Sequence, residues 1–224
     1  MFTLYSADFT GNPGNCSYPH KTVVMNTDNL RKAVCHDYVC AEYKNHYRNG
    51  ENFISADCLP VDCDNDHSED PKDWVTPADV LEAFPGVSIA IHYSRFNNRE
   101  KNGKPARPKF HVLFPIDRMT DATLYSDMKK LVNSIFPYFD TKALDAARFF
   151  FGTQEPNVDL YPGRMNLTEF LNDDEFDAGL PGGHEKDAVI PEGSRNAVMS
   201  RFAGIVIKKY GDSEKAYQSI LEKA

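Results

Sequence analysis

The chain has 224 residues, of which 41% are hydrophobic, 12% aromatic and 26% charged. This composition is typical of one folded domain, or of one domain with a small appendage, and it excludes disordered, collagen-like and coiled-coil proteins. No apolar run approaches the ~20 residues of a membrane helix, and the N-terminal MFTLYSADFT lacks the basic and apolar regions of a secretory signal. We therefore expect a cytoplasmic protein.

The formal net charge of -8 at pH 7 is not the basic balance that nucleic-acid-binding domains often show. The charges are, however, separated along the chain. Residues 57–73 hold seven acidic side chains and one basic, whereas residues 95–118 hold seven basic and two acidic. Because a polyanion responds to the local field, the total charge does not exclude a nucleic-acid ligand. On charge alone, two solvated loops of opposite sign are the simpler explanation.

Predicted strands and helices alternate from the first third of the chain onward. The spacing of apolar residues predicts a helix over 28–47. A short strand is expected over 58–64, and a helix over 76–83 with Thr76 as its cap. A buried strand is expected over 87–93.

The second half of the chain continues this alternation. Residues 97–108, rich in Asn, Gly and Pro, are expected to form the loop of a long hairpin, and the strand that returns from it covers 110–114. A helix is expected over 124–136, capped by Thr120 or Asp121, followed by a strand over 149–151. Interleaved strands and helices with at least one hairpin predict a mixed α/β or α+β core.

The C-terminal part differs in composition from the rest. Residues 173–193 are acidic and rich in Gly and Pro, which is typical of a linker. Ser194 and Ser213 are expected to cap two short helices after it. Two such helices bury little surface by themselves, so they must pack on the main domain or belong to something longer.

The cysteines form an odd-numbered set without a C-x-x-C pair. This pattern favours free thiols over a disulfide framework or a ribbon-type zinc site. A looser zinc cluster fits no common ligand spacing, so zinc is not expected. Its candidate ligands would be Cys16, His20, Cys35, His36 and Cys40, while Cys58 and Cys63 complete the set of cysteines.

Asp62 and Asp64 are separated by one residue in a predicted strand. Successive side chains of a strand point to opposite faces, so these two carboxylates leave the same face and can meet one divalent cation. The alternative is a solvated strand end, because D-x-D is short and common.

Strand alternation places Lys109, His111 and Leu113 on one face of the returning strand. Lys109 and His111 would then share a surface at the exit of the basic hairpin, where both are suited to hold a triphosphate. The alternative is a structural histidine that is hydrogen-bonded within the fold.

Asp140 follows two aromatic residues and is a candidate third metal ligand. Arg148, farther along the chain, has a planar guanidinium group that can donate two hydrogen bonds to a phosphate. Asp145 is the other candidate for the third ligand, although it can equally pair with Arg148 or cap a turn.

In this order, the segments VDCDND, PKFHVLFPI and YFDTKALDAARFFFG resemble the three motifs of the archaeo-eukaryotic primase superfamily. Those motifs are an apolar residue with D-x-D, a short stretch ending in His, and an apolar residue with Asp and a downstream Arg. The version here is most similar to the primase-polymerases of phages, plasmids and other mobile elements, over residues 53–152. The family's second motif commonly has Ser two positions before His, where this chain has Lys109.

The segment PEGSRNAVMSRFAGIVIKKYG resembles the start of the helical module that follows the catalytic domain in such proteins. The resemblance therefore implies a primase-polymerase catalytic domain over 1–180 and a linker with a helical module over 181–224. The implied fold is an RNA-recognition-like catalytic sheet joined to a second α/β unit, with the active site between them.

The resemblance also implies the site and the function. Asp62, Asp64 and Asp140 would be catalytic and hold two Mg²⁺ or Mn²⁺ ions. The chain would be a DNA-dependent nucleotidyltransferase, a DNA primase or polymerase, working on single-stranded DNA with nucleoside triphosphates in the replication of a mobile element, with a replicative helicase as a possible partner. The nucleotide would be bound by Ser94, Lys109, His111 and Arg148, and the nucleic acid by Arg95, Arg99, Lys101, Lys104 and Arg107.

Two alternatives stay open at this point. One is a gap-filling or translesion polymerase on the same core, and the other is a non-catalytic nucleic-acid-binding replication module. A rolling-circle nickase is disfavoured because it would need a pair of metal-binding histidines in the pattern H-x-H, which the chain does not contain.

Overall fold

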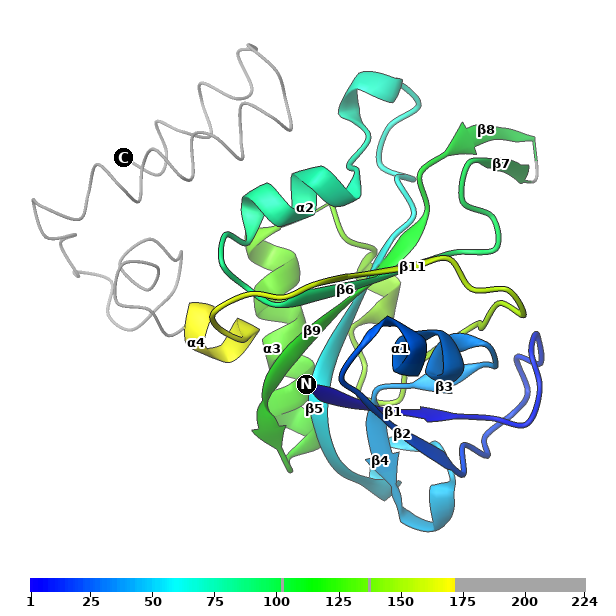
Figure 1. Cartoon of the computed structure of the whole chain (residues 1–224), viewed down its shortest axis with the longest axis vertical. Coiled ribbons are helices and arrows are strands. Elements are labelled where there is room, and N and C mark those ends of the chain that lie inside the picture. The colour runs from blue at the N-terminus through cyan, green and yellow to red at the C-terminus, as the bar shows by residue number, and fades with distance from the viewer. Residues whose placement is uncertain (102, 137, 172–224) are drawn as a thin grey trace, which may run out of the picture. The chain divides into compact units, whose positions relative to one another are not determined.

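The computed structural model describes residues 1–101, 103–136 and 138–171. Among these residues, 1–67 and 74–167 form one compact unit, and 68–73 and 168–171 belong to a second one. The first unit holds all the described strands and is a mixed α/β structure, as the sequence predicts (Figure 1). The boundary expected near residue 180 and the C-terminal helices lie outside the described residues.

All strand pairs in the described sheets are antiparallel. A four-stranded sheet has the order β10-β3-β1-β2, and a five-stranded sheet has the order β11-β6-β9-β5-β4. The strands of the first are β1 (Phe2–Ser6), β2 (His20–Val24), β3 (Tyr38–Val39) and β10 (Phe149–Phe150). Those of the second are β4 (Ala41–Tyr43), β5 (Phe53–Cys63), β6 (Ile89–Tyr93), β9 (Phe110–Met119) and β11 (Val158–Tyr161).

The remaining described elements are a small ribbon, four α-helices and four short 3₁₀ turns. The ribbon consists of β7 (Arg99–Lys101) and β8 (Lys104–Arg107). The helices are α1 (Thr27–Val34), α2 (Pro77–Ala83), α3 (Ala122–Ile135) and α4 (Leu167–Leu171), and the turns are Lys44–His46, Gly50–Asn52, Pro71–Asp73 and Thr141–Ala143. None of these helices combines the length and apolar character needed to cross a membrane.

Side-chain caps fix the starts of the helices. Asn26 accepts a hydrogen bond from the Asn29 amide at the start of α1, and Asp121 accepts two at the start of α3. Thr76 and Asp79 form a reciprocal capping box at α2. The predicted helix after Thr76 is confirmed, and of the two caps considered for α3, Thr120 and Asp121, the structure has Asp121.

The predicted helix over 28–47 is wrong beyond Val34. There the chain turns away and continues as β3 and β4. The turn is held by Asp37, whose buried carboxylate accepts hydrogen bonds from the backbone amides of Gly11, Asn12 and Gly152. The partners of Asp37 are distant in sequence, so the local apolar spacing contains no sign of this turn.

The strands of the large sheet extend beyond their predicted bounds. β5 begins at Phe53 rather than near residue 58, and β9 continues to Met119 rather than ending near 114. Along their shared length Asp62 lies opposite His111, and the register shifts once, between Ala56 and Cys58. The predicted hairpin loop over 97–108 contains the ribbon β7–β8, whose basic side chains are largely exposed.

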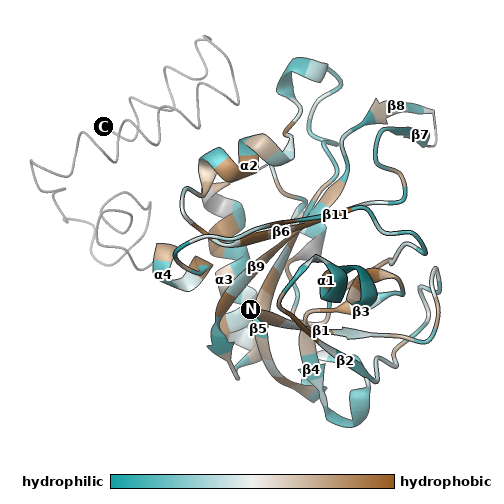
Figure 2. Cartoon of the chain, in the orientation of Figure 1, coloured by the Kyte–Doolittle hydropathy of each residue, from teal (hydrophilic) through white to brown (hydrophobic). Residues whose placement is uncertain are grey.

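The large sheet is covered on both faces. On one face, Cys58, Ala90 and Leu113 pack with residues of the smaller sheet and α1 in a single apolar cluster. On the other, α3 packs against β5 and β9, and Phe84 contacts Phe114 and other aromatic rings. Figure 2 shows β6 and β9 strongly hydrophobic and β7 hydrophilic. The face that carries Leu113 continues along β9 to His111, so the buried layer between the sheets becomes polar at that end.

Candidate active site

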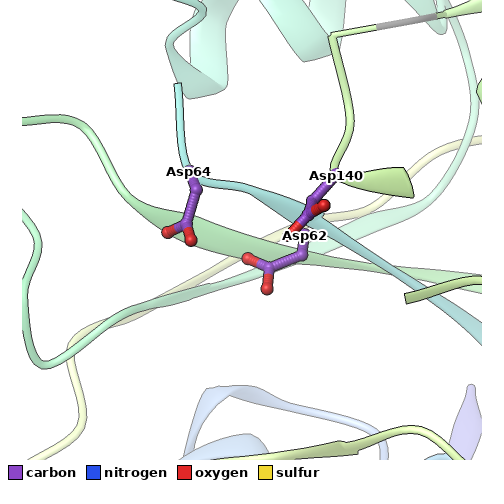
Figure 3. Close-up of side chains that lie close together, drawn as sticks. All are labelled: Asp62, Asp64 and Asp140. Atoms are coloured by element: carbon purple, nitrogen blue, oxygen red, sulfur yellow. The ribbon is translucent and has the colours of Figure 1, made fainter. Parts of the chain in front are cut away.

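Three carboxylates meet at the polar end of the large sheet. Asp62 is the penultimate residue of β5, Asp64 follows the strand, and Asp140 precedes the turn Thr141–Ala143. One oxygen from each carboxylate lies within 4.8 Å of those of the other two (Figure 3). The backbone amide of Asp140 donates a 2.7 Å hydrogen bond to the Asp62 carbonyl, so the two segments are joined directly beside the carboxylates.

The structure places Asp140, and not Asp145, beside the D-x-D pair. The Asp140 carboxylate also accepts a hydrogen bond from the Lys142 amide at the start of its turn. Asp145 is exposed and accepts from the Ala147 amide, which is the turn-capping role considered as an alternative.

Burial and like charge disfavour the ionised form of Asp62, whose residue is 7% exposed. Burial and the nearby Asp64 carboxylate raise the pKa of Asp62 to about 7, although Arg148 acts to lower it. A divalent cation would relieve this repulsion in place of a proton. Because all three donors are carboxylate oxygens, they fit hard ions such as Mg²⁺ and Mn²⁺.

Lys109 is the cation that contacts Asp64. Its ammonium group lies 3.0 Å from the Asp64 carboxylate and donates a 3.0 Å hydrogen bond to the Asp64 carbonyl. The Lys109 side chain is buried and also lies 3.6 Å from Asp66. Lys109 is therefore already engaged with the carboxylates.

Asp66 belongs to a second ionic cluster, which shares Lys109 with the carboxylate site. Its carboxylate lies 3.3 Å from Lys104 and 3.6 Å from both Arg107 and Lys109. Burial acts to raise the pKa of Asp66, but the neighbouring cations, Lys109 first, outweigh it and lower the pKa. This cluster joins the base of the basic ribbon to the loop that carries Asp64.

Arg148 supplies a second cation at the carboxylates. Its Nη2 lies 3.7 Å from Asp62, and its guanidinium lies over the ring of Phe150 at 5.8 Å from the centroid. Its Nε is buried and has no hydrogen-bond partner among the described residues. A buried donor left unpaired is costly, so this atom is suited to an anionic ligand.

His111 faces the carboxylates from β9. Its Nε2 lies 3.8 Å from Asp62, and its Nδ1 is hydrogen-bonded to the hydroxyl of Tyr38. His92 on β6 contacts both of these residues. Sequence reasoning missed Tyr38 and His92, although a histidine inside the apolar run Ile89–Tyr93 was an available signal.

The other predicted ligand-binding residues fall into three kinds. The Ser94 hydroxyl accepts a hydrogen bond from the Phe96 amide, and its own amide donates to the Lys109 carbonyl. Arg107 is 1% exposed and donates to the Asn65 carbonyl, so its guanidinium is used inside the protein and is not presented to a nucleic acid. The exposed cations are Arg95, which stacks on Phe151 at 4.4 Å, and Arg99, Lys101 and Lys104 on the ribbon.

The residues considered for a zinc cluster have other contacts. All five cysteines are free thiols, and Cys40 is buried whereas Cys16 and Cys35 are partly exposed. His20 lies 2.6 Å from Asp8, and His36 is near the Thr10 hydroxyl.

The chain is similar to a solved phage protein in structure but matches no protein family in sequence. No protein-family model matches the chain, and no curated protein matches it. The AEP domain of the cyanophage S-2L primase-polymerase (PrimPol) is similar with a TM-score of 0.41 and 12% sequence identity, covering 72% of this chain and 81% of that one. The function of this chain therefore has to follow from its own residues.

Proposed function

We propose that the chain is a metal-dependent nucleotidyltransferase that makes or extends primers on single-stranded DNA from nucleoside triphosphates. The observation that carries this proposal is the meeting of Asp62, Asp64 and Asp140 beside His111 and Arg148. Carboxylates that bind divalent cations, next to donors suited to an anion, are what a metal-bound triphosphate requires. The order of the three motifs along the chain supports the same function.

The three carboxylates would hold two divalent cations. When bound, such cations favour deprotonation of the primer 3′ oxygen and neutralise the triphosphate and the departing pyrophosphate. The protein's part is positional. The amide of Asp140, bonded to the Asp62 carbonyl, fixes the spacing of the ligands, and Lys109 neutralises Asp64 before the ligand arrives.

The donors around the carboxylates would hold the incoming nucleotide. The unpartnered Nε of Arg148 and the Nε2 of His111 are the donors suited to triphosphate oxygens. Arg95, Arg99, Lys101 and Lys104 are exposed and would contact the template backbone, which gives binding that weakens as salt is added.

Nucleotide incorporation by Asp62→Asn and Asp64→Asn variants tests the function. Each variant should lose metal-dependent incorporation by about a thousandfold or more, because removal of one ligand charge weakens the site that stabilises the transition state. Asp57→Asn is the matched control. It lies near the middle of the same strand, where its carboxylate accepts hydrogen bonds from Thr3 and not from the site, so it should keep incorporation.

The outcomes separate the alternatives. Wild-type incorporation by either site variant would refute the proposal. If the wild-type protein binds single-stranded DNA but incorporates nothing with Mg²⁺ or Mn²⁺, a non-catalytic binding module is favoured. Templates with and without a primer distinguish primer synthesis from extension alone, which is the activity of a gap-filling or translesion polymerase.

A further inference from the structure

Behind His111 lies a closed set of hydrogen bonds among three buried side chains from three strands. The hydroxyl of Tyr38 on β3 lies 3.1 Å from Nδ1 of His92 on β6 and 3.1 Å from Nδ1 of His111 on β9. The two Nδ1 atoms lie 3.3 Å apart. Tyr38 and His92 are 0% exposed, so water does not share these bonds.

Counting protons shows that the two imidazoles must be opposite tautomers. Both rings are buried away from water, which disfavours the charged imidazolium form, so each ring is neutral and carries a single proton. If both Nδ1 atoms carried a proton, the Tyr38 hydroxyl would have no acceptor. If neither did, the single hydroxyl proton could satisfy only one of them, and two lone pairs would face each other.

The surroundings of the two Nε2 atoms decide which tautomer each ring adopts. Nε2 of His111 faces the negative cluster of three carboxylates, 3.8 Å from Asp62, where a proton on nitrogen is favourable and a bare lone pair is repelled. Nε2 of His92 lies 3.3 Å from the hydroxyl of Thr153, which can donate to it. A consistent chain of donors therefore runs from Thr153 through His92 and Tyr38 to His111.

We propose that Tyr38, His92 and Thr153 are positioning residues that hold His111 in the Nε2–H tautomer, as a fixed donor to an anionic group at the carboxylate site. The identity of that anion as a nucleoside triphosphate rests on the proposed function. The network itself does not, because it is complete without a ligand.

The tautomers of the free protein provide the first test. Two-bond ¹H–¹⁵N spectra of histidine-labelled protein near neutral pH should show His111 protonated at Nε2 and His92 protonated at Nδ1. His92→Gln and His111→Gln variants assign the signals. The reverse pair of tautomers, or the same tautomer for both, would overturn the inference whether or not the protein incorporates nucleotides.

The second test removes single hydroxyl groups. Tyr38→Phe removes the donor to His111, so a second His111 tautomer should appear and the nucleotide KM should rise about fivefold, with a smaller change in kcat. Tyr125→Phe is the control, because it deletes another buried hydroxyl, which donates to the Cys58 carbonyl away from the network. It should leave the tautomers and KM unchanged.

Thr153 offers a finer version of this comparison. Thr153→Val removes the hydroxyl at nearly constant shape and should raise KM about twofold, whereas Thr153→Ser should restore the wild-type value.

Equal KM values for Tyr38→Phe and Tyr125→Phe would overturn the positioning role. If the wild-type protein incorporates no nucleotide, the proposed function fails, and the spectra still decide the network.

Discussion

Two polar clusters, one partly exposed and one largely buried, meet at His111 and differ in kind. The carboxylate cluster of Asp62, Asp64 and Asp140 has excess negative charge, and its neighbour Arg148 keeps an unpartnered donor. The network of Tyr38, His92 and Thr153 is neutral and internally hydrogen-bonded. The network that orients His111 therefore has its hydrogen-bond partners within the fold. The carboxylate cluster lacks partners that a bound ligand would supply.

The two clusters should respond to pH in opposite directions. The pKa of Asp62 is raised from 3.8 to about 7, so the folded state binds this proton more tightly than the unfolded chain, and stability falls as pH rises through that window. The histidine pKa values are lowered from 6.5, so stability falls as pH drops below 6.5 and the unfolded chain takes up protons.

The largest effect on stability is expected for Asp62→Asn. This variant replaces a buried carboxylate with a neutral amide, so the carboxylate cluster loses part of its negative charge. Without divalent ions, the free energy of unfolding near pH 8 should rise by on the order of 2 kcal/mol, because the variant no longer holds a buried charge beside Asp64. The gain should disappear near pH 4, where Asp62 of the wild type is protonated. Urea unfolding at several pH values measures this, and a destabilised variant at pH 8 would contradict it.

An intermediate effect is expected for Lys109→Met, which removes the counterion of Asp64. In the free protein an incoming cation must displace the ammonium group 3.0 Å from that carboxylate. Titration calorimetry with Mg²⁺ and no nucleotide should therefore show about fivefold tighter binding. Lys104→Met is the control, since Lys104 pairs with Asp66 and is half exposed. Weaker Mg²⁺ binding by Lys109→Met would show that Lys109 supports the ligand geometry more than it competes with the ion.

The smallest effect is expected at the exposed ribbon, where charge is screened by solvent. Arg99→Gln or Lys101→Gln should weaken binding of single-stranded DNA about twofold to threefold at moderate salt, and should lower the slope of log affinity against log salt by about 0.7. Lys130→Gln, an exposed change on α3, should change neither quantity. Fluorescence anisotropy over a range of salt concentrations makes the comparison, and an unchanged slope would remove the ribbon from the template path.

An element or contact can be predicted from the sequence when the residues that determine it are close together along the chain. The helix caps Thr76 and Asp121 and the shared face of Asp62 and Asp64 follow from neighbours within a few residues. Tyr38 was assigned to a helix instead, because its partners His92 and His111 are far along the chain. β1 and β2 of the smaller sheet and β11 at the edge of the larger sheet were not predicted at all, since they are defined by the distant strands with which they pair.

The same difference between local and long-range interactions applies to the residues considered for the site. The motifs predicted that the D-x-D pair meets a carboxylate of the third motif and favoured Asp140, but they left Asp145 open as an alternative. They did not predict that Arg107 would be buried against Asn65 and Trp74. Charge patterning identifies a basic segment, but only tertiary packing decides which of its members face outward.

The pairing of Asp62 with His111 across β5 and β9 restricts how the gene can change length. Because side chains alternate along a strand, deleting one codon between the register shift at Ala56/Cys58 and Asp62 would turn the carboxylate to the opposite face. An extra residue before that shift would change only the size of the existing bulge and would leave the register of Asp62 unchanged. Homologues should therefore vary in length before residue 56 and keep a constant spacing from 58 to 64.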